Sequence, residues 1–218
     1  MVGQTPKRRR HALAMALVTM GALVHLLQNM ACPSYVRNDF VVSHLEQGPR
    51  YGETPYALYV ARRYGRYGIP RFAGKRVRHE TFSAFFKNKD HSGLAQTTAD
   101  HYFSPGSLPV PQTIEKKNKI EKHLKIFSKK HFARPVLWPL PLKGLDRGET
   151  TYLIRRKTKK QFGPIRVAAY GISPSGELKF WLERRTYNDY AGELLPRAVR
   201  FTEGLIAYLL RGRLAIET

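Results

Sequence analysis

The residues with the clearest chemical potential lie in one stretch near the start of this 218-residue chain. His25 and Asn29 are four positions apart, so on a helix they lie one turn apart on the same face. Tyr35 follows ten residues after His25, and His44 comes next. An imidazole on an apolar helix is either a metal ligand or a core side chain held by a hydrogen bond, and the residues alone leave both open.

Other catalytic motifs are missing from the sequence. There is no Gly-x-Ser-x-Gly elbow, no Gly-x-Gly-x-x-Gly loop and no Walker loop. The single cysteine, Cys32, excludes an intramolecular disulfide framework and a thiolate cage for a metal. Nucleophilic catalysis and nucleotide-cofactor chemistry therefore have no support in the sequence.

The order of residues around His25 resembles a known family. The chain reads His-Leu-Leu-Gln-Asn-Met over 25–30 and Pro-Ser-Tyr-Val-Arg-Asn-Asp over 33–39. This is similar to the zinc-dependent phospholipase C / S1–P1 nuclease family in its bacterial branch, whose pattern is His-Leu-Leu-Gln-Asp-Met followed by Pro-Ala-His-x-Arg-Asn-Asp. Weaker similarity at 94–104 and 195–208 extends the resemblance over residues 15–211.

The resemblance implies a fold and an activity. It implies a mainly α-helical phospholipase C/P1 nuclease-like domain over residues 1–218, with a small antiparallel β insertion at about 150–185 before the last helix. The reaction would be metal-assisted hydrolysis of a phosphodiester or phosphomonoester, with a phospholipid or a nucleic acid as the substrate. It also implies a secreted or membrane-associated protein, although the residues leave a cytoplasmic location open.

The same resemblance implies zinc and a set of ligands. His25 is the surviving ligand of the first motif, with Asp39, His44 and Glu53 as candidate additional ligands, because imidazole and carboxylate groups suit zinc. Asn29 and Tyr35 stand where the family has an aspartate and a histidine, and a phenol with a pKa near 10 is a poor zinc ligand. A complete three-zinc centre is therefore not expected, and a degenerate, inactive hydrolase is one interpretation.

The charge of the chain suggests a second class of function. Lys and Arg number 38 against 16 Asp and Glu, which gives a net charge of +22, while 42% hydrophobic residues argue against intrinsic disorder. A run of arginines and lysines over 62–78 is interleaved at its start with tyrosines over 51–67, a combination that can grip phosphates and stack on bases. The alternative to a hydrolase is thus a non-enzymatic basic protein that binds nucleic acid or an anionic membrane. An inward-packed tyrosine face with solvated arginines is the plain structural explanation, and the oligomeric state stays open.

The amino-terminal segment allows two interpretations. Basic residues at 7–10 precede an apolar run from Ala12 to Leu27, which is typical of a signal peptide or a membrane anchor over 7–27. The run has only 16 residues, contains His25, and repeats its apolar residues at helical spacing. We interpret it as a buried core helix, with the signal or anchor as the alternative.

Hydrophobic periodicity and turn residues place the remaining elements. Apolar residues at helical spacing, bounded by proline and glycine, predict helices, and the change to short β-rich runs after residue 149 predicts strands. Pro196 is expected to start or kink the last helix. The predicted helices cover 11–31, 55–67, 80–87, 94–102, 113–131 and 189–211, and the predicted strands 150–154, 165–170 and 178–182.

Overall fold

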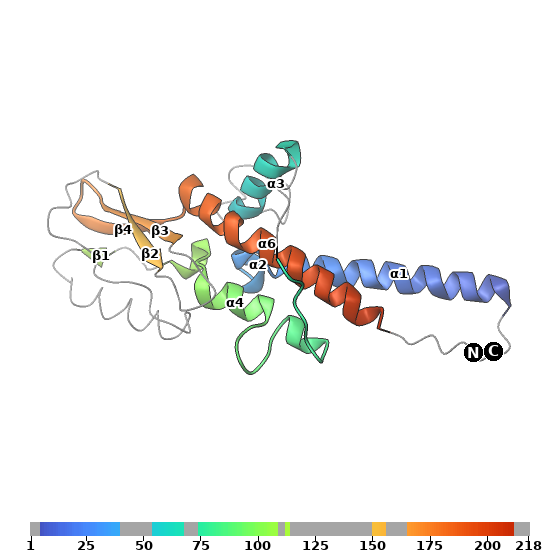
Figure 1. Ribbon diagram of the computed structural model, residues 1–218. Helices are drawn as coiled ribbons and strands as arrows, with labels where there is room; N and C mark the ends of the chain where they lie inside the picture. Colours follow the sequence, from blue (N-terminus) through green and yellow to red (C-terminus); the bar gives the residue numbers. More distant parts are fainter. Residues whose placement is uncertain are drawn as a thin grey trace.

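The computed structural model describes residues 5–39, 54–67, 74–108, 112–113, 150–155 and 165–211. The α-helices, short 3-10 helices apart, are α1 (Pro6–Asn29), α2 (Pro33–Val36), α3 (Pro55–Tyr67), α4 (Leu94–His101) and α6 (Arg184–Leu209). The strands are β1 (Gln112–Thr113), β2 (Thr151–Arg155), β3 (Ile165–Ile172) and β4 (Glu177–Trp181). Figure 1 shows a sheet at one end, a central cluster of helices, and α1 extending away from both.

The sheet is antiparallel and has the strand order β1-β4-β3-β2. β3 and β4 form a hairpin whose turn covers Ser173–Gly176. Gly176 has φ of +82°, a conformation that glycine adopts at no steric cost. β3 is one of the two inner strands and is buried over most of its length, so its apolar run reflects cover on both faces.

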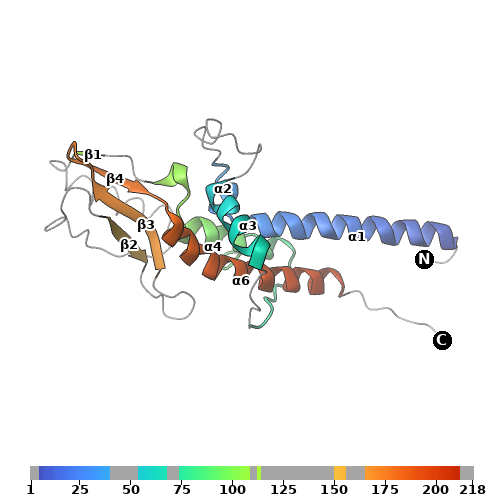
Figure 2. The same ribbon diagram turned by 90° about the horizontal axis from the view of Figure 1, so that it is seen from above.

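The helix α6 joins the sheet to the other helices. Its amino-terminal half packs against β3, and its carboxy-terminal half lies beside α1 (Figures 1 and 2). Val167 of β3, Tyr190 and Leu194 of α6 and Leu94 of α4 are fully buried in one hydrophobic cluster. The sheet therefore completes the core that the helices begin.

This arrangement corrects the predicted fold class. The expectation of a mainly α-helical domain with a small β insertion is wrong, because the described residues form a mixed α and β structure in which a sheet shares the core with the helices. The strands themselves lie within one or two residues of their predicted limits. What the sequence hid is that the hydrophobic face of α6 needs β3 to cover it.

The interpretation of the amino-terminal segment as a core helix is also wrong. In α1 only Leu27 is buried, whereas Leu13, Leu17 and Val18 are each more than half exposed. Met20 is the first residue of α1 that is partly buried, and from there the helix packs beside α6. In the two views of Figures 1 and 2, α1 projects beyond the remaining described residues 31–211, which we call the body.

The other predicted helices agree with the structure to different extents. The helix over 55–67 has its predicted limits, and that over 94–102 ends one residue earlier. The predicted helix over 80–87 is reduced to a 3-10 turn at Ser83–Phe85, and Pro196 lies inside α6 without ending it. Apart from its first residue, the predicted helix over 113–131 lies outside the described residues.

Candidate anion-binding site

His25 lies on the exposed surface of α1 and contacts its neighbour one turn away. The Nδ2 of Asn29 is 3.3 Å from the Nε2 of His25. The predicted proximity of the two side chains is therefore confirmed, and their interaction is an amide–imidazole contact. This pairing uses one ring nitrogen of the histidine.

The other candidate zinc ligands are placed differently. Asp39 accepts a hydrogen bond of 2.6 Å from the backbone N–H of Gly106, and Tyr35 packs against the hydrophobic core. His44 and Glu53 lie outside the described residues. Among the residues that the structure describes, no three His, Cys, Asp or Glu side chains gather as a metal site would require. Zinc binding stays a prediction.

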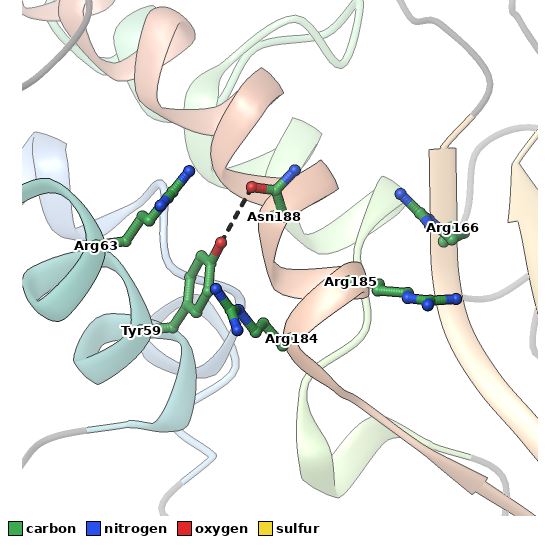
Figure 3. A pocket seen from close by; sticks show the side chains of 6 residues that line it. All are labelled: Tyr59, Arg63, Arg166, Arg184, Arg185 and Asn188. Carbon is green, nitrogen blue, oxygen red and sulfur yellow. Dashed lines mark hydrogen bonds between the residues drawn. The ribbon is translucent and has the colours of Figure 1, made fainter.

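A different cluster of side chains surrounds a cavity of about 280 Å³ between α3, β3 and the start of α6 (Figure 3). Because α3 packs against α6 and β3 packs against the same helix, the three elements bring distant parts of the chain together. The Oη of Tyr59 donates a hydrogen bond of 3.1 Å to Oδ1 of Asn188 across the cavity. Its lining residues are Tyr59, Arg63, Arg166, Arg184, Arg185 and Asn188, which we call the arginine pocket.

The start of α6 is electrostatically unusual. A helix amino terminus carries partial positive charge and exposes N–H groups, and acidic or capping side chains normally compensate it. Here Glu183 occupies the N-cap position without forming a side-chain cap, and within the described chain the first turn holds no acidic residue. It holds Arg184 and Arg185 instead, so two guanidinium groups add to the positive end of the helix.

The carboxylates near the arginine pocket are already bound to protein groups. Asp189 accepts two hydrogen bonds of 2.8 Å from the guanidinium of Arg166 and one of 2.9 Å from its backbone N–H. Burial acts to raise the pKa of Asp189, but these bonds outweigh it and lower the pKa, so the carboxylate is ionised at neutral pH. Glu183 accepts a hydrogen bond of 2.5 Å from the hydroxyl of Tyr152.

The resulting charge favours an anion. Four guanidinium groups face two carboxylates, which leaves a net charge of +2 before the helix dipole is added. Burial raises the pKa of Tyr59, so its hydroxyl remains protonated and polar without charge. The arrangement can bind a compact anion through charge-assisted hydrogen bonds, and the described residues around the pocket offer no activated nucleophile for covalent chemistry.

A second basic cavity of about 550 Å³ lies along the segment 74–79 and is lined by Lys75, Arg76 and Arg78. The backbone N–H of Val77 donates a hydrogen bond of 3.1 Å to the carbonyl oxygen of Arg200, which fixes this segment against α6. The three basic side chains are exposed. They belong to the basic run that the sequence singled out.

Sequence reasoning found only part of the arginine pocket. Tyr59 and Arg63 belong to the stretch in which tyrosines and arginines alternate, but Arg166 and Asn188 carry no local signal. Two adjacent arginines at the start of a helix with no capping side chain are a signal that could have been noticed at Arg184 and Arg185. The predicted start of that helix, at 189, placed both arginines outside it.

Comparisons with known proteins found no match among family models, curated proteins or solved structures.

Proposed function

We propose that this protein is a membrane-anchored phosphate-binding protein, with α1 in the bilayer and the arginine pocket as the ligand site. The observation that carries the ligand assignment is the cavity beside the uncapped start of α6, which four arginines line. The anchor assignment rests on α1, whose apolar side chains are exposed.

The composition of α1 supports a bilayer as its surroundings. Its 24 residues pass the length and hydropathy requirements for a membrane span, and only 6% of the apolar window is buried against the body. At 100° per residue, the exposed positions Met15 and Val18 lie about 140–160° around the helix from the exposed Leu13. A partner helix would cover one stripe, whereas lipid covers all faces, so the distribution favours lipid.

The chemistry of the arginine pocket supports phosphate as the bound group. Arginine presents a planar fork of donors that matches phosphate oxygens, and a helix amino terminus adds N–H groups and positive potential. Asn188 adds an amide whose oxygen is already held by Tyr59, which leaves its Nδ2 as a donor. These groups are all donors, as an anion with several oxygens requires.

The position of the arginine pocket limits the source of the phosphate. The pocket lies at the end of α6 farthest from α1 (Figure 1). From Arg184 to Thr202, which contacts α1, the helix rises by about 27 Å at 1.5 Å per residue. Headgroups of the bilayer that holds α1 are therefore out of reach, and the ligand is a phosphate on another molecule.

Binding can be measured by calorimetry on the full chain in a non-ionic detergent. Inorganic phosphate, glycerol phosphate and a short single-stranded DNA serve as probes. We expect phosphate and the monoester to bind, and Arg184→Gln to weaken them about tenfold or more, because it removes a charge-assisted hydrogen bond. The matched control is Arg62→Gln, since Arg62 is exposed on α3 and does not line the pocket.

Each outcome of that measurement has a meaning. Equal weakening by both variants would show unspecific attraction to the basic surface and would reject the site. Tight binding of DNA alone, with a steep salt dependence, would favour the nucleic-acid alternative. Absence of phosphate and monoester binding would also reject the proposal.

The anchor has its own test, which includes its direction. Four basic residues at 7–10 lie at the start of α1, before its apolar run, and Arg37 is the only lysine or arginine between positions 30 and 49, so the positive-inside rule favours an amino terminus in the cytoplasm. In cells that express Ser175→Cys on a Cys32→Ser background, we expect a membrane-impermeant maleimide to label the body without lysis. Labelling only after lysis would reverse the orientation, and release of the chain by alkaline carbonate would reject the anchor.

A further inference from the structure

We propose that the end of α6 and the basic segment 74–79 contact the same bilayer as α1. In this arrangement the apolar end of α6 enters the boundary of the acyl chains, and the basic segment lies on anionic headgroups. The inference rests on the proposed anchoring by α1 and adds a second surface to it.

The first step is the mismatch between α1 and a bilayer. The apolar part of α1 that the body leaves bare is residues 12–19, about 12 Å of helix at 1.5 Å per residue, because the basic residues 7–10 before it stay outside the hydrocarbon. The hydrocarbon core of a bilayer is about 30 Å thick. A span by α1 must therefore also take in the rest of the apolar run, from Met20 to Leu27, and this is the part of α1 that packs beside α6.

The second step is the direction of α6. Figures 1 and 2 show the end of α6 pointing toward the start of α1, so the two helices are antiparallel where they meet. The Nε2 of Gln28 donates a hydrogen bond of 3.4 Å to Oγ1 of Thr202, so these two residues lie at the same level along the two helix axes. Leu210 is eight residues farther along, so it lies at about the level of Met20. The end of α6 therefore lies beside the part of α1 that must enter the hydrocarbon layer of the bilayer.

The third step is that the end of α6 is built for such a layer. Residues 204–210 read Gly-Leu-Ile-Ala-Tyr-Leu-Leu without a charge, and Leu209 and Leu210 are 36% and 65% exposed. The guanidinium of Arg211 lies 5.4 Å from the centre of the Tyr208 ring, one turn back toward the body. An arginine in a membrane extends its side chain in this way, back along the helix toward the headgroups. The guanidinium then lies at the same depth as the tyrosine ring, and tyrosine is itself enriched at membrane interfaces.

The fourth step is the position of the charges. The segment 74–79 is held at the level of residues 200–204 of α6, which corresponds to the body end of the apolar run of α1. Lys75, Arg76 and Arg78 are exposed there, against two exposed carboxylates, Glu80 and Glu203. An excess of basic side chains at headgroup level is complementary to anionic phospholipids, in whichever leaflet these lie.

Fluorescence quenching on the reconstituted full chain tests the inference. Single cysteines on the Cys32→Ser background carry an environment-sensitive label at Val18, Leu209 or Ser175, and the vesicles contain acyl-chain quenchers. Val18→Cys reports insertion of α1, and Ser175→Cys in the β3–β4 turn is the aqueous control. We expect quenching at positions 18 and 209 and none at 175.

The outcomes separate this inference from the anchor itself. Quenching at 18 without quenching at 209 would overturn the contact of α6 and leave the anchor standing. No quenching at 18 would contradict the anchor, and this inference with it.

Charge variants test the headgroup contact. Adding anionic phosphatidylglycerol to phosphatidylcholine vesicles should increase quenching at 209, and Arg76→Glu should remove most of that increase. Lys179→Glu changes the charge equally on β4, far from α1 (Figure 1), and should leave the increase intact. Equal effects of the two variants, or no dependence on anionic lipid, would overturn the headgroup contact.

Discussion

The hydroxyl of Tyr190 provides the sharpest test of how the sheet is joined to the helices. Tyr190 lies on α6 and is fully buried. Its hydroxyl donates a hydrogen bond of 2.6 Å to the carbonyl oxygen of Val167 on β3 and accepts one of 2.9 Å from the backbone N–H of Phe103 after α4. Burial raises its pKa far above the ordinary value, so the hydroxyl keeps its proton throughout the normal pH range. One oxygen thus connects β3, α6 and the end of α4.

The expected effect of Tyr190→Phe follows from these two bonds. The ring remains, including its edge-on contact with Tyr102 at 4.9 Å between centroids, so little packing is lost. Removing one partner from a buried hydrogen bond costs about 1–3 kcal/mol, and two such losses predict a decrease of about 2–6 kcal/mol in the free energy of unfolding. The slope of the unfolding transition should not change, since the surface exposed on unfolding is the same.

Urea unfolding in a non-ionic detergent, followed by circular dichroism, measures this decrease. Tyr187→Phe is the matched control, because Tyr187 is on the same helix and its hydroxyl makes no hydrogen bond within the part of the chain that the structure describes. We expect the control to change the free energy by less than about 0.5 kcal/mol. If both variants lost similar, small amounts of stability, the idea that this hydroxyl unites sheet and helices would be refuted.

Three further changes have defined outcomes. Gly204→Ala should destabilise the fold, because a Cβ there would overlap the carbonyl oxygen of Val77, whereas Gly192→Ala, on an open face of α6, should stabilise it by about 0.5–1 kcal/mol in the same urea assay. Asp189→Asn should lower the stability of the fold at neutral pH, because it breaks the ion pair that lowers the pKa of Asp189. The difference in stability between this variant and the unmodified chain should shrink as the pH falls below 3.8, which thermal unfolding at a series of acidic pH values would reveal. His25→Ala should leave the zinc content of the purified chain unchanged by elemental analysis if the histidine only contacts Asn29, and a loss of one zinc per chain would restore the metal hypothesis.

The sequence predicted local structure well where the local signal agreed with the packing. α3 has its predicted limits because proline marks its start and its tyrosines recur at helical spacing. The sequence-based prediction of a buried core helix failed at α1, where Leu13, Leu17 and Leu27 fit one face of a helix. The same helix is apolar on its other faces too, and a pattern on one face cannot reveal that no protein surface covers it.

The candidate site, unlike the local structure, could hardly be predicted from the sequence. Arg166 comes from the centre of a sheet and Arg63 from a helix about a hundred residues earlier, and only the packing of both elements on α6 makes them neighbours. No spacing rule joins such positions. The order of residues around His25 matches the family pattern, and Asn29 contacts the His25 ring, but Asp39 binds the backbone N–H of Gly106 instead of converging with them.

The net charge of +22 suggested a basic surface for polyanions, but part of that charge is used inside the body. Arg155 is 2% exposed, forms an ion pair with Glu193 and lies 5.0 Å from the centre of the Tyr102 ring. Arg37 is largely buried and donates to the carbonyl oxygen of Ala99; burial lowers its pKa, but it remains charged. These arginines satisfy core groups and cannot bind external phosphates, so the count of basic residues overstates the surface field. The proposal of phosphate binding therefore rests on the arginines that line the cavity beside the uncapped start of α6. The Arg184→Gln variant tests this site, whereas a general change of salt concentration weakens attraction to every basic part of the surface.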